Sequence, residues 1–154
     1  MTADLSPHAG PPVGFAPHFR KSPVTDAWEP LFSRRAGGVV EIGFHAGRPH
    51  ANGRGFVHGG LISALADNAM GLSCAEQLGD TASLVTVSLA LDFLGSASLG
   101  QWVQVEPKLN RMGATLCFAE AMVTADGAPC AKAHATFRVV RRDAPLGGSS
   151  VAAR

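Results

Sequence analysis

The stretch NGRGFVHGGLISALAD, residues 52–67, sets three kinds of polar group at the start of a long apolar run. It begins with Asn52, continues through His58-Gly59-Gly60 and ends at Asp67, the only residue between positions 59 and 75 that is charged at neutral pH. A carboxylate inside an apolar helix loses hydration on folding, which is costly unless the group has a partner or a function. The stretch therefore predicts a functional site near the beginning of a helix.

Hydrophobic residues after His58 recur at the spacing of a helix. One face carries Leu61, Ile62, Leu65, Ala66, Ala69, Met70 and Leu72, and the other is filled by Ala64, Cys74 and Ala75. We expect a helix over about residues 60–78 that is surrounded by protein. The apolar run is shorter than the roughly 18 residues of a membrane span. Asp67 and Asn68 also interrupt it, so the sequence does not predict a membrane segment.

The remainder of the chain is typical of strands joined by short turns. From residue 83 to 94 large apolar side chains alternate with small or polar ones, which predicts a half-buried strand with Val85, Val87, Leu89, Leu91 and Phe93 on its buried face. We expect further strands at 37–45, 101–110, 114–124 and 129–140, with hairpin turns at 111–113 and at Asp126-Gly127. A short helix is expected at 23–32. Pro107 has no backbone N–H to donate to a neighbouring strand, so we expect it at a sheet edge or a bulge.

The order of these elements, a strand, one long helix and then four strands, does not alternate as a parallel sheet requires. It predicts the α+β class, with an antiparallel sheet of five to six strands wrapped around one long central helix. We expect a single domain at residues 21–142. A flexible segment rich in proline and glycine is expected at 1–20, and a flexible tail at 143–154.

Charge and cysteine content exclude several classes of function. The formal net charge is +1 and no basic run exceeds two arginines, so the chain lacks the electrostatic signature of a nucleic-acid-binding protein. Cys74, Cys117 and Cys130 have no metal-binding or disulfide spacing, which favours reduced thiols in the cytoplasm. The N-terminus also lacks the pattern of a secretory signal.

The residues at the helix start are suited to stabilising a negative charge. The first N–H groups of a helix point outward and carry partial positive charge, which suits a developing oxyanion. Gly59 has no side chain, so a carbonyl group can approach its N–H closely. Asp67 lies two turns further on, which favours an Asp67 supplied by a second copy of the chain across a two-fold axis. The alternative is a structural Asp67, satisfied by backbone groups or by an arginine.

The same residues resemble a known family. The pattern Asn52-x5-His58-Gly59-Gly60-x6-Asp67-Asn68, followed by Val85-Thr86-Val87 and Asp92-Phe93-Leu94, resembles the hotdog-fold acyl-CoA thioesterases. Within them it is most similar to the phenylacetate-degradation (PaaI-like) branch of the 4-hydroxybenzoyl-CoA thioesterase superfamily. The resemblance covers about residues 39–140 and implies a hotdog fold, hydrolysis of an acyl-CoA thioester, and a homodimer that pairs further into a tetramer.

The resemblance also implies a role for each residue of the motif. Asn52 and the N–H of Gly59 polarise the thioester carbonyl, while Asp67 of the opposite subunit acts as general base or nucleophile. His58 holds the loop and the thioester end in place, and Thr86 hydrogen-bonds the attacking water. Family members often have glutamate where this chain has Asp67, and the shorter side chain leaves room for a water molecule, which favours the general base. Further contacts to the substrate are expected from Gly60, Asn68, Phe56 and Met70, and contacts to the phosphates of CoA from Lys108 and Arg111.

Two other functions remain open at this level. One is a hydratase or dehydratase of acyl thioesters on the same fold, and the other is a non-catalytic module that binds or senses acyl-CoA. No metal or other cofactor is expected, because His45, His50 and His58 lack the carboxylate or cysteine partners of a metal site. The acyl group is expected to be an aryl group or a medium- to long-chain acid.

Overall fold

The computed structural model describes residues 10–80 and 82–141. The expected tail at 143–154 and the first nine residues of the expected N-terminal segment lie outside this range. In chain order the elements are β1 (Ala16–Pro17), the 3-10 turn η1 (Asp26–Trp28), β2 (Phe32–Ala36), β3 (Val39–His45), the 3-10 turn η2 (Arg48–His50), α1 (Gly59–Leu78), β4 (Ala82–Phe93), β5 (Trp102–Met112), β6 (Leu116–Ala125) and β7 (Ala128–Arg141).

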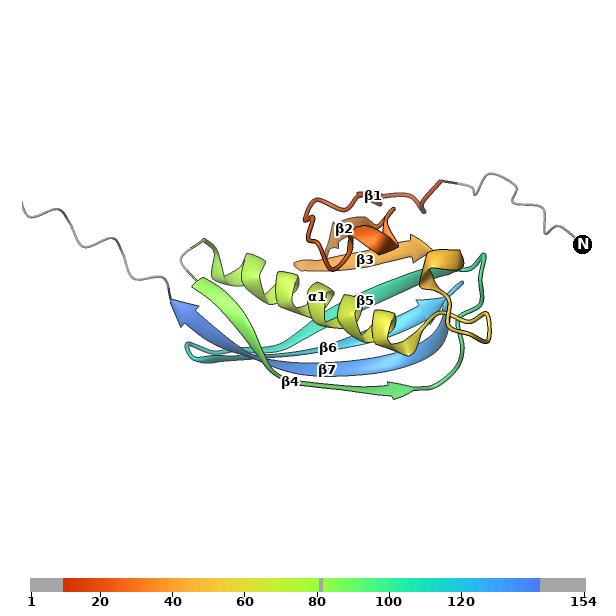
Figure 1. The fold of residues 1–154 in the computed structure, drawn as a ribbon. Coiled ribbons are helices and arrows are strands. Elements are labelled where there is room, and N and C mark those ends of the chain that lie inside the picture. Colours follow the sequence, from red (N-terminus) through yellow and green to blue (C-terminus); the bar gives the residue numbers. More distant parts are fainter. Residues whose placement is uncertain (1–9, 81, 142–154) are drawn as a thin grey trace, which may run out of the picture.

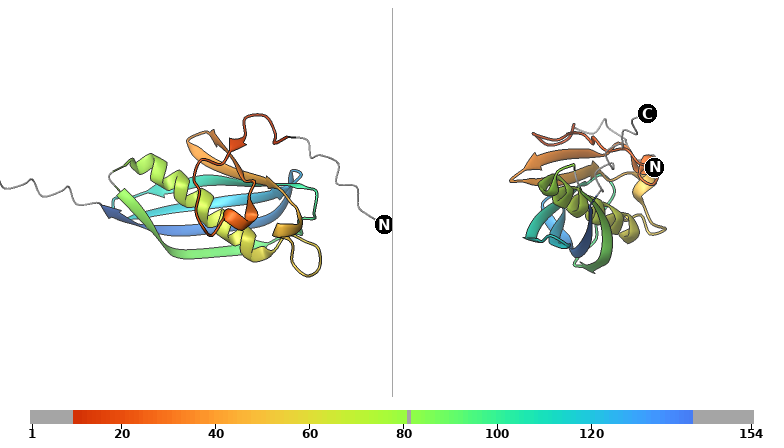
Figure 2. Two further views of the ribbon diagram at one scale, coloured as in Figure 1. Left: turned by 45° about the horizontal axis from the view of Figure 1, so that its top comes forward. Right: turned by 90° about the vertical axis from the view of Figure 1, so that its left-hand side faces the viewer.

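One antiparallel sheet curls around the long helix. Its strand order is β1-β2-β3-β5-β6-β7-β4, so β4 forms one edge. Figure 1 shows α1 lying along the concave side of the sheet, and the end-on view in Figure 2 shows the strands curving round it. The α+β class and the single central helix are as predicted. The sheet has seven strands rather than five to six, because β1 and β2 were not expected.

The helix is buried on most of its surface, as its sequence predicts. Its buried side chains, which include Leu65 and Met70, pack against the inner faces of β3, β5, β6 and β7. A polar contact adds to this packing, since the hydroxyl of Ser73 accepts a hydrogen bond from the N–H of Val40 at 2.9 Å. The helix begins where His58 caps it and ends at Gly79, whose φ of 72° suits a residue without a side chain.

The hairpin turn predicted at Asp126-Gly127 is present, and so is the restriction at Pro107. The turn predicted at 111–113 lies instead at 113–115, because Arg111 and Met112 still pair with β6. Asp126 and Gly127 both have positive φ and join β6 to β7 by a two-residue turn. The pairing of β3 with β5 ends at Val105, so Pro107 lies beyond the part of β5 that β3 covers. A register shift between Leu109 and Arg111 then bends the end of β5.

β4 differs from its predicted burial. Val85 and Val87 were expected to face the core, but their exposed fractions are 56% and 60%. The reason is that Thr86 faces α1, where it contacts Asp67, so Val85 points to the opposite face. A register shift between Thr86 and Ser88 then reverses the alternation, and of the predicted set only the later residues Leu89 and Leu91 pack against the core. Among the described strands β4 pairs with β7 alone, so its other edge is free. A long edge strand that carries exposed valines is a surface ready to pair with another strand.

The part of the N-terminal segment that the structure describes also differs from expectation. Residues 10–20 were expected to be loosely ordered, but Ala16 and Pro17 pair with β2, and Phe15 and His18 are buried. The helix expected at 23–32 is reduced to the turn η1, because the chain is already extended after Pro30 and enters β2 at Phe32.

His18 makes the stability of this N-terminal attachment depend on pH. Its exposed fraction is 1%, and neither ring nitrogen has a hydrogen-bond partner in the described part of the chain. Burial lowers the pKa of His18 below its ordinary 6.5, although the carboxylate of Glu29 opposes the shift. Below pH 6.5 the unfolded chain therefore binds a proton at His18 that the folded chain does not bind. The contribution of the neutral, buried His18 to the free energy of unfolding is complete above pH 6.5 and is lost as the pH falls.

We expect His18→Phe to make the melting temperature less sensitive to acid. Between pH 7.5 and pH 5.5 the melting temperature of the wild type should fall by a few degrees more than that of the variant, as measured by circular dichroism. The exposed His134, changed to glutamine, is the control and should melt as the wild type does at both pH values. An equal fall in the wild type and in His18→Phe would contradict this account.

Candidate functional site

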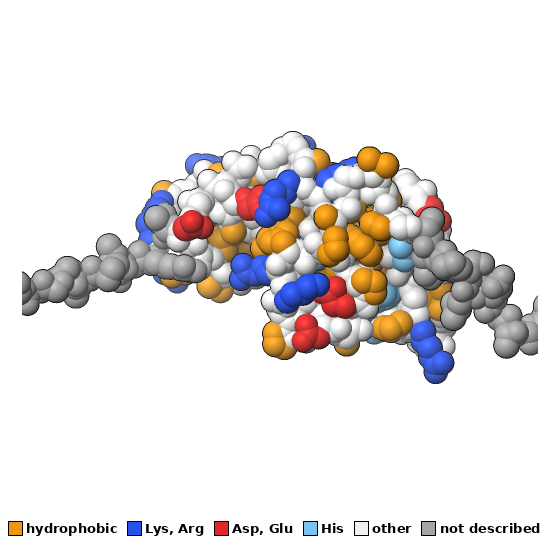
Figure 3. Space-filling view, turned by 90° about the horizontal axis from the view of Figure 1, so that it is seen from above, with side chains coloured by type: hydrophobic (Ala, Val, Ile, Leu, Met, Phe, Trp, Pro, Cys, Tyr) orange, Lys and Arg blue, Asp and Glu red, His pale blue; other side chains and the backbone are white. Residues whose placement is uncertain are grey.

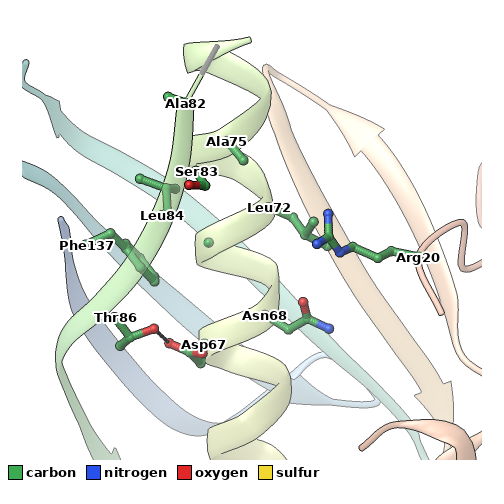
Figure 4. A pocket seen from close by; sticks show the side chains of 11 residues that line it. Arg20, Asp67, Asn68, Leu72, Ala75, Ala82, Ser83, Leu84, Thr86 and Phe137 are labelled. Atoms are coloured by element: carbon green, nitrogen blue, oxygen red, sulfur yellow. Dashed lines mark hydrogen bonds between the residues drawn. The ribbon is translucent and has the colours of Figure 1, made fainter. Parts of the chain in front are cut away.

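Asp67 and Thr86 meet where α1 passes β4. The hydroxyl of Thr86 donates a hydrogen bond to Oδ1 of Asp67 at 2.9 Å, as Figure 4 shows. Asp67 is half-buried, and among residues 10–80 and 82–141 it forms no ion pair with a lysine, arginine or histidine. The alternative of a structural carboxylate neutralised by an arginine therefore finds no support within the described chain. The threonine fixes the direction of the carboxylate and leaves its other oxygen available.

A groove of about 260 Å³ opens beside this pair. Asn68 lines it, as expected for a residue that contacts the substrate. The rest of the lining comes from Gly71, Leu72 and Ala75 on α1, Ala82, Ser83 and Leu84 on β4, Phe137 on β7, and Arg20 from the segment before η1. Arg20 could not be predicted as a site residue, because it lies in a stretch without hydrophobic periodicity and far from the motif.

A second groove, of about 280 Å³, lies at the start of the helix. Asn52, Phe56 and Gly59 line it together with Phe93 from the end of β4. The N–H of Gly59 has no hydrogen-bond acceptor among the described residues, so it is available to a ligand. The ring of Phe93 covers Gly59 so closely that a Cβ at position 59 would lie 3.1 Å from its Cζ atom. A side chain at position 59 would therefore displace the Phe93 ring by a few tenths of an ångström.

The side chain of Asn52 closes a loop through its Oδ1 atom and leaves its Nδ2 atom available. Its Oδ1 accepts hydrogen bonds from the N–H groups of Arg54 at 2.8 Å and Phe56 at 3.2 Å, which closes the loop between η2 and α1. The two hydrogens on its Nδ2 have no acceptor in the described part of the chain. Asn52 can therefore donate to a ligand in the same groove as Gly59 while it holds the loop in shape.

His58 and Gly60 are hydrogen-bonded to each other at the start of α1. Nδ1 of His58 accepts a hydrogen bond from the N–H of Gly60 at 2.9 Å, which makes His58 the cap of α1. The N–H of His58 donates to the carbonyl of His50 at 2.8 Å and ties the cap to the preceding loop. His58 thus positions the loop. The expectation that Gly60 contacts the substrate is wrong for its N–H, which is already used.

The two grooves have no lining residue in common within one chain. Asp67 follows Gly59 by eight residues, which is about 12 Å along a helix. A single small carbonyl group cannot contact the N–H of Gly59 and the carboxylate of Asp67 of the same chain. The sequence prediction that these residues serve one substrate therefore requires two copies of the chain.

Three other expected contacts are not in either groove. Met70 is fully buried, with an exposed fraction of 0%, and belongs to the hydrophobic core because it faces the sheet. Lys108 points away from α1 and forms an ion pair with Glu120 at 3.2 Å on the outer face of the sheet. Arg111 lies near the end of β5 and lines neither groove. The sequence could place all three on their elements but could not show which way each side chain faces.

The described residues also bear on the metal and surface predictions. Within them no three His, Cys, Asp or Glu side chains come close enough together to hold a metal ion. None of their helices is long and apolar enough to cross a membrane. Figure 3 shows lysine, arginine and acidic side chains interspersed on one face, without a continuous basic patch there.

Comparison with known proteins agrees with the fold. Residues 54–131 match the model of the family described as the thioesterase superfamily. The Pseudomonas aeruginosa protein PA0474, provisionally named an esterase, is 35% identical over 129 residues, which cover 83% of this chain and 96% of that protein.

Two solved structures extend the comparison. The conserved protein PA5202 of Pseudomonas aeruginosa has a TM-score of 0.71 and 24% identity, covering 78% of this chain and 95% of that chain. The Streptococcus mutans protein smu.793, solved bound to acetyl-CoA, has a TM-score of 0.62 and 26% identity, covering 68% of this chain and 83% of that chain. With the family match and the curved sheet around α1, these findings identify the chain as a member of the hotdog-fold thioesterase superfamily.

Proposed function

We propose that the protein is an acyl-CoA thioesterase. The observation that carries this proposal is the hydrogen bond from Thr86 to Asp67, which orients a carboxylate at the edge of an open groove. Within residues 10–80 and 82–141 no cation neutralises it. Family membership and the acetyl-CoA held by a relative support the class of substrate. A thioester is already reactive, so a positioned base worth about 10²–10⁴-fold and an oxyanion site are sufficient catalytic groups.

In the proposed reaction Asp67 removes a proton from a water molecule. The oxygen of that water forms a bond to the thioester carbon, and the negative charge moves to the carbonyl oxygen, where the N–H of Gly59 and Nδ2 of Asn52 stabilise it. The C–S bond then breaks as the carbonyl re-forms, and the CoA sulfur leaves and takes up a proton. Direct attack by Asp67 would instead form an anhydride that water hydrolyses. The hydroxyl of Thr86 keeps Asp67 in place and retains lone pairs that can accept from the water.

The active site in this proposal lies between two copies of the chain. The free edge of β4, with its exposed Val85 and Val87, is a surface suited to pairing with the same strand of a partner. An antiparallel pairing centred between Leu89 and Ala90 sets Thr86 opposite the partner's Phe93. Since Phe93 covers Gly59, this arrangement brings the Asp67 groove of one chain to the Gly59 groove of the other. Pairing of two such dimers into a tetramer is part of the same proposal.

Other features of the proposal follow the sequence motif. We place the protein in the PaaI-like branch and its substrates among aryl- or medium- to long-chain acyl-CoAs. Asn68 and Phe56 each line a groove and are proposed to contact the substrate. Cys74, Cys117 and Cys130 are all buried and unpaired, which supports a reducing, cytoplasmic environment.

The test is release of free thiol from a panel of phenylacetyl-, hydroxybenzoyl-, short-chain and long-chain acyl-CoAs, followed with a colour reagent. We expect turnover of at least one member. Crotonyl-CoA and 3-hydroxyacyl-CoA are included because their interconversion without thiol release would indicate a hydratase. Tight binding of acyl-CoA with no turnover of any member would indicate a binding module and would contradict the proposal.

Thr86 provides a finer test of how the carboxylate is held. We expect Thr86→Val, which keeps the shape of the side chain and removes its hydroxyl, to lower kcat about tenfold because Asp67 loses a hydrogen bond to a charged oxygen. KM should change little, and Thr86→Ser should restore most of kcat. A valine variant with the kcat of the wild type would show that Asp67 is oriented by other means.

A further inference from the structure

The groove beside Asp67 contains a charged group that hydrolysis does not use. Arg20 lines this groove together with Asp67 and Asn68. Figure 4 shows its side chain reaching towards Leu72, on the opposite side of α1 from Thr86. The groove therefore extends across the exposed face of the helix, with a carboxylate at one side and a guanidinium at the other.

The chain on either side of Arg20 is fixed. The N–H of His18 donates to the carbonyl of Leu31 at 2.8 Å, and the His18 side chain is buried. Lys21 forms an ion pair with Glu29 at 2.7 Å. Arg20 lies between these two contacts, and its exposed side chain is directed over α1 (Figure 4).

The charge of Arg20 is not neutralised within the described chain. Glu76 on α1 is already paired with Arg35 at 2.6 Å. Asp80 lines an adjacent hollow together with Arg20, but no ion pair joins them. A ligand that covered Arg20 without offering an acceptor would remove water from an unpaired cation at a cost in binding free energy. The groove therefore favours a ligand that carries a negative charge at this position.

The path from Asp67 to Arg20 is open. Asp67, Asn68, Leu72 and Arg20 line one groove, with Leu72 next to Arg20 (Figure 4), and Gly71 adds no side chain to it. Phe137 lies beneath, 3.4 Å from where a Cβ on Gly71 would be. A helix with its side chains is about 10 Å across. An acyl group of medium length, with its thioester carbon at Asp67, can thus reach Arg20 with its far end.

We propose that Arg20 determines substrate specificity by binding a carboxylate at the far end of the acyl group, so that CoA thioesters of dicarboxylic acids are preferred. This inference rests on the proposed thioesterase function. The phosphates of CoA are a second source of negative charge, but they are attached through the sulfur and lie beyond the pantetheine arm. When extended, that arm is longer than the width of one helix, so the phosphates would lie beyond Arg20 and would not contact it.

The experiment compares kcat/KM for adipyl-CoA and hexanoyl-CoA, which have the same number of carbons and differ in the terminal carboxylate. Arg20→Gln should lower kcat/KM for adipyl-CoA by about ten- to hundredfold, mainly through KM, because a hydrogen-bonded ion pair is lost. For hexanoyl-CoA it should stay within about twofold of the wild type, since the neutral chain gains nothing from the charge. Lys132→Gln removes a cation from the outer face of the sheet and should change neither value.

Two results would overturn the proposal. A loss that is equal for both CoA thioesters, and that disappears with the corresponding phosphate-free acyl-pantetheine thioesters, would assign Arg20 to the coenzyme. No loss with either thioester would show that Arg20 does not contact the substrate. Hydrolysis of hexanoyl-CoA by the wild type tests the thioesterase function separately, so failure of that function is distinguishable from failure of this inference.

Discussion

Replacement of Asp67 by asparagine lowers kcat for acyl-CoA hydrolysis at least a hundredfold, if the carboxylate is the base or the nucleophile. Asparagine has nearly the same shape, and its Oδ1 can still accept the hydrogen bond from Thr86. The change therefore removes the charge and the basic oxygen while the contact between α1 and β4 remains. General-base catalysis is typically worth about 10²–10⁴-fold, which sets the size of the loss. Thiol release at saturating substrate measures it.

Two further variants separate chemistry from structure in this experiment. Asp26→Asn removes an exposed carboxylate in η1 that lines neither groove, and should leave kcat unchanged. Asp67→Glu keeps the carboxylate and should retain measurable turnover, since family members often have glutamate at this position. Equal turnover in Asp67→Asn and the wild type would transfer the catalytic role to another residue and contradict the assignment.

Replacement of Asn52 by aspartate should lower kcat by about 10²–10³-fold, the usual effect of losing one donor to an oxyanion. Oδ1 of the aspartate can still accept from the N–H groups of Arg54 and Phe56, so the loop keeps its shape. The Nδ2 donor is replaced by a second oxygen, which repels the negative charge that develops on the thioester carbonyl. The measurement is thiol release, with circular dichroism to verify the fold.

Asn52→Ala separates the role of this side chain in closing the loop from its role as a donor to the oxyanion. It removes the donor and also the acceptor that closes the loop, so both kcat and the melting temperature should fall. Asn52→Asp should lower kcat with much less effect on the melting temperature. If the two variants lost activity and stability in parallel, Asn52 would serve only to hold the loop.

The central helix and the strands after it could be predicted because local sequence determines them. Hydrophobic residues from Leu61 to Leu72 recur at helical spacing, and His58 marks the start as a cap. Asp126-Gly127 specifies a tight turn by its backbone chemistry alone. Asn52 and Gly59 line one groove at the start of α1 because they are close in sequence, and Asp67 lies two turns further along the helix, as its spacing requires.

What the sequence could not predict depends on contacts between distant parts of the chain. Val85 and Val87 alternate as in a half-buried strand, but which face meets α1 changes at the register shift between Thr86 and Ser88, which periodicity does not encode. Likewise Met70 is apolar whether it lines a groove or fills the core. Arg20 reaches the groove only because β1 pairs with β2, and neither short strand has a clear pattern of its own.

The most direct test of a shared active site is activity in mixed dimers. Asp67→Asn and Asn52→Asp chains, each carrying a different affinity tag, are produced together, and the heterodimer is isolated by purification on both tags in turn. If Asp67 of one chain acts with Asn52 of the other, the heterodimer contains one intact site out of two, and kcat returns to about half of the wild-type value per dimer. Each variant homodimer alone should remain at least a hundredfold below the wild type. A heterodimer as inactive as the two homodimers would contradict the account, because it would place both residues in a site within a single chain.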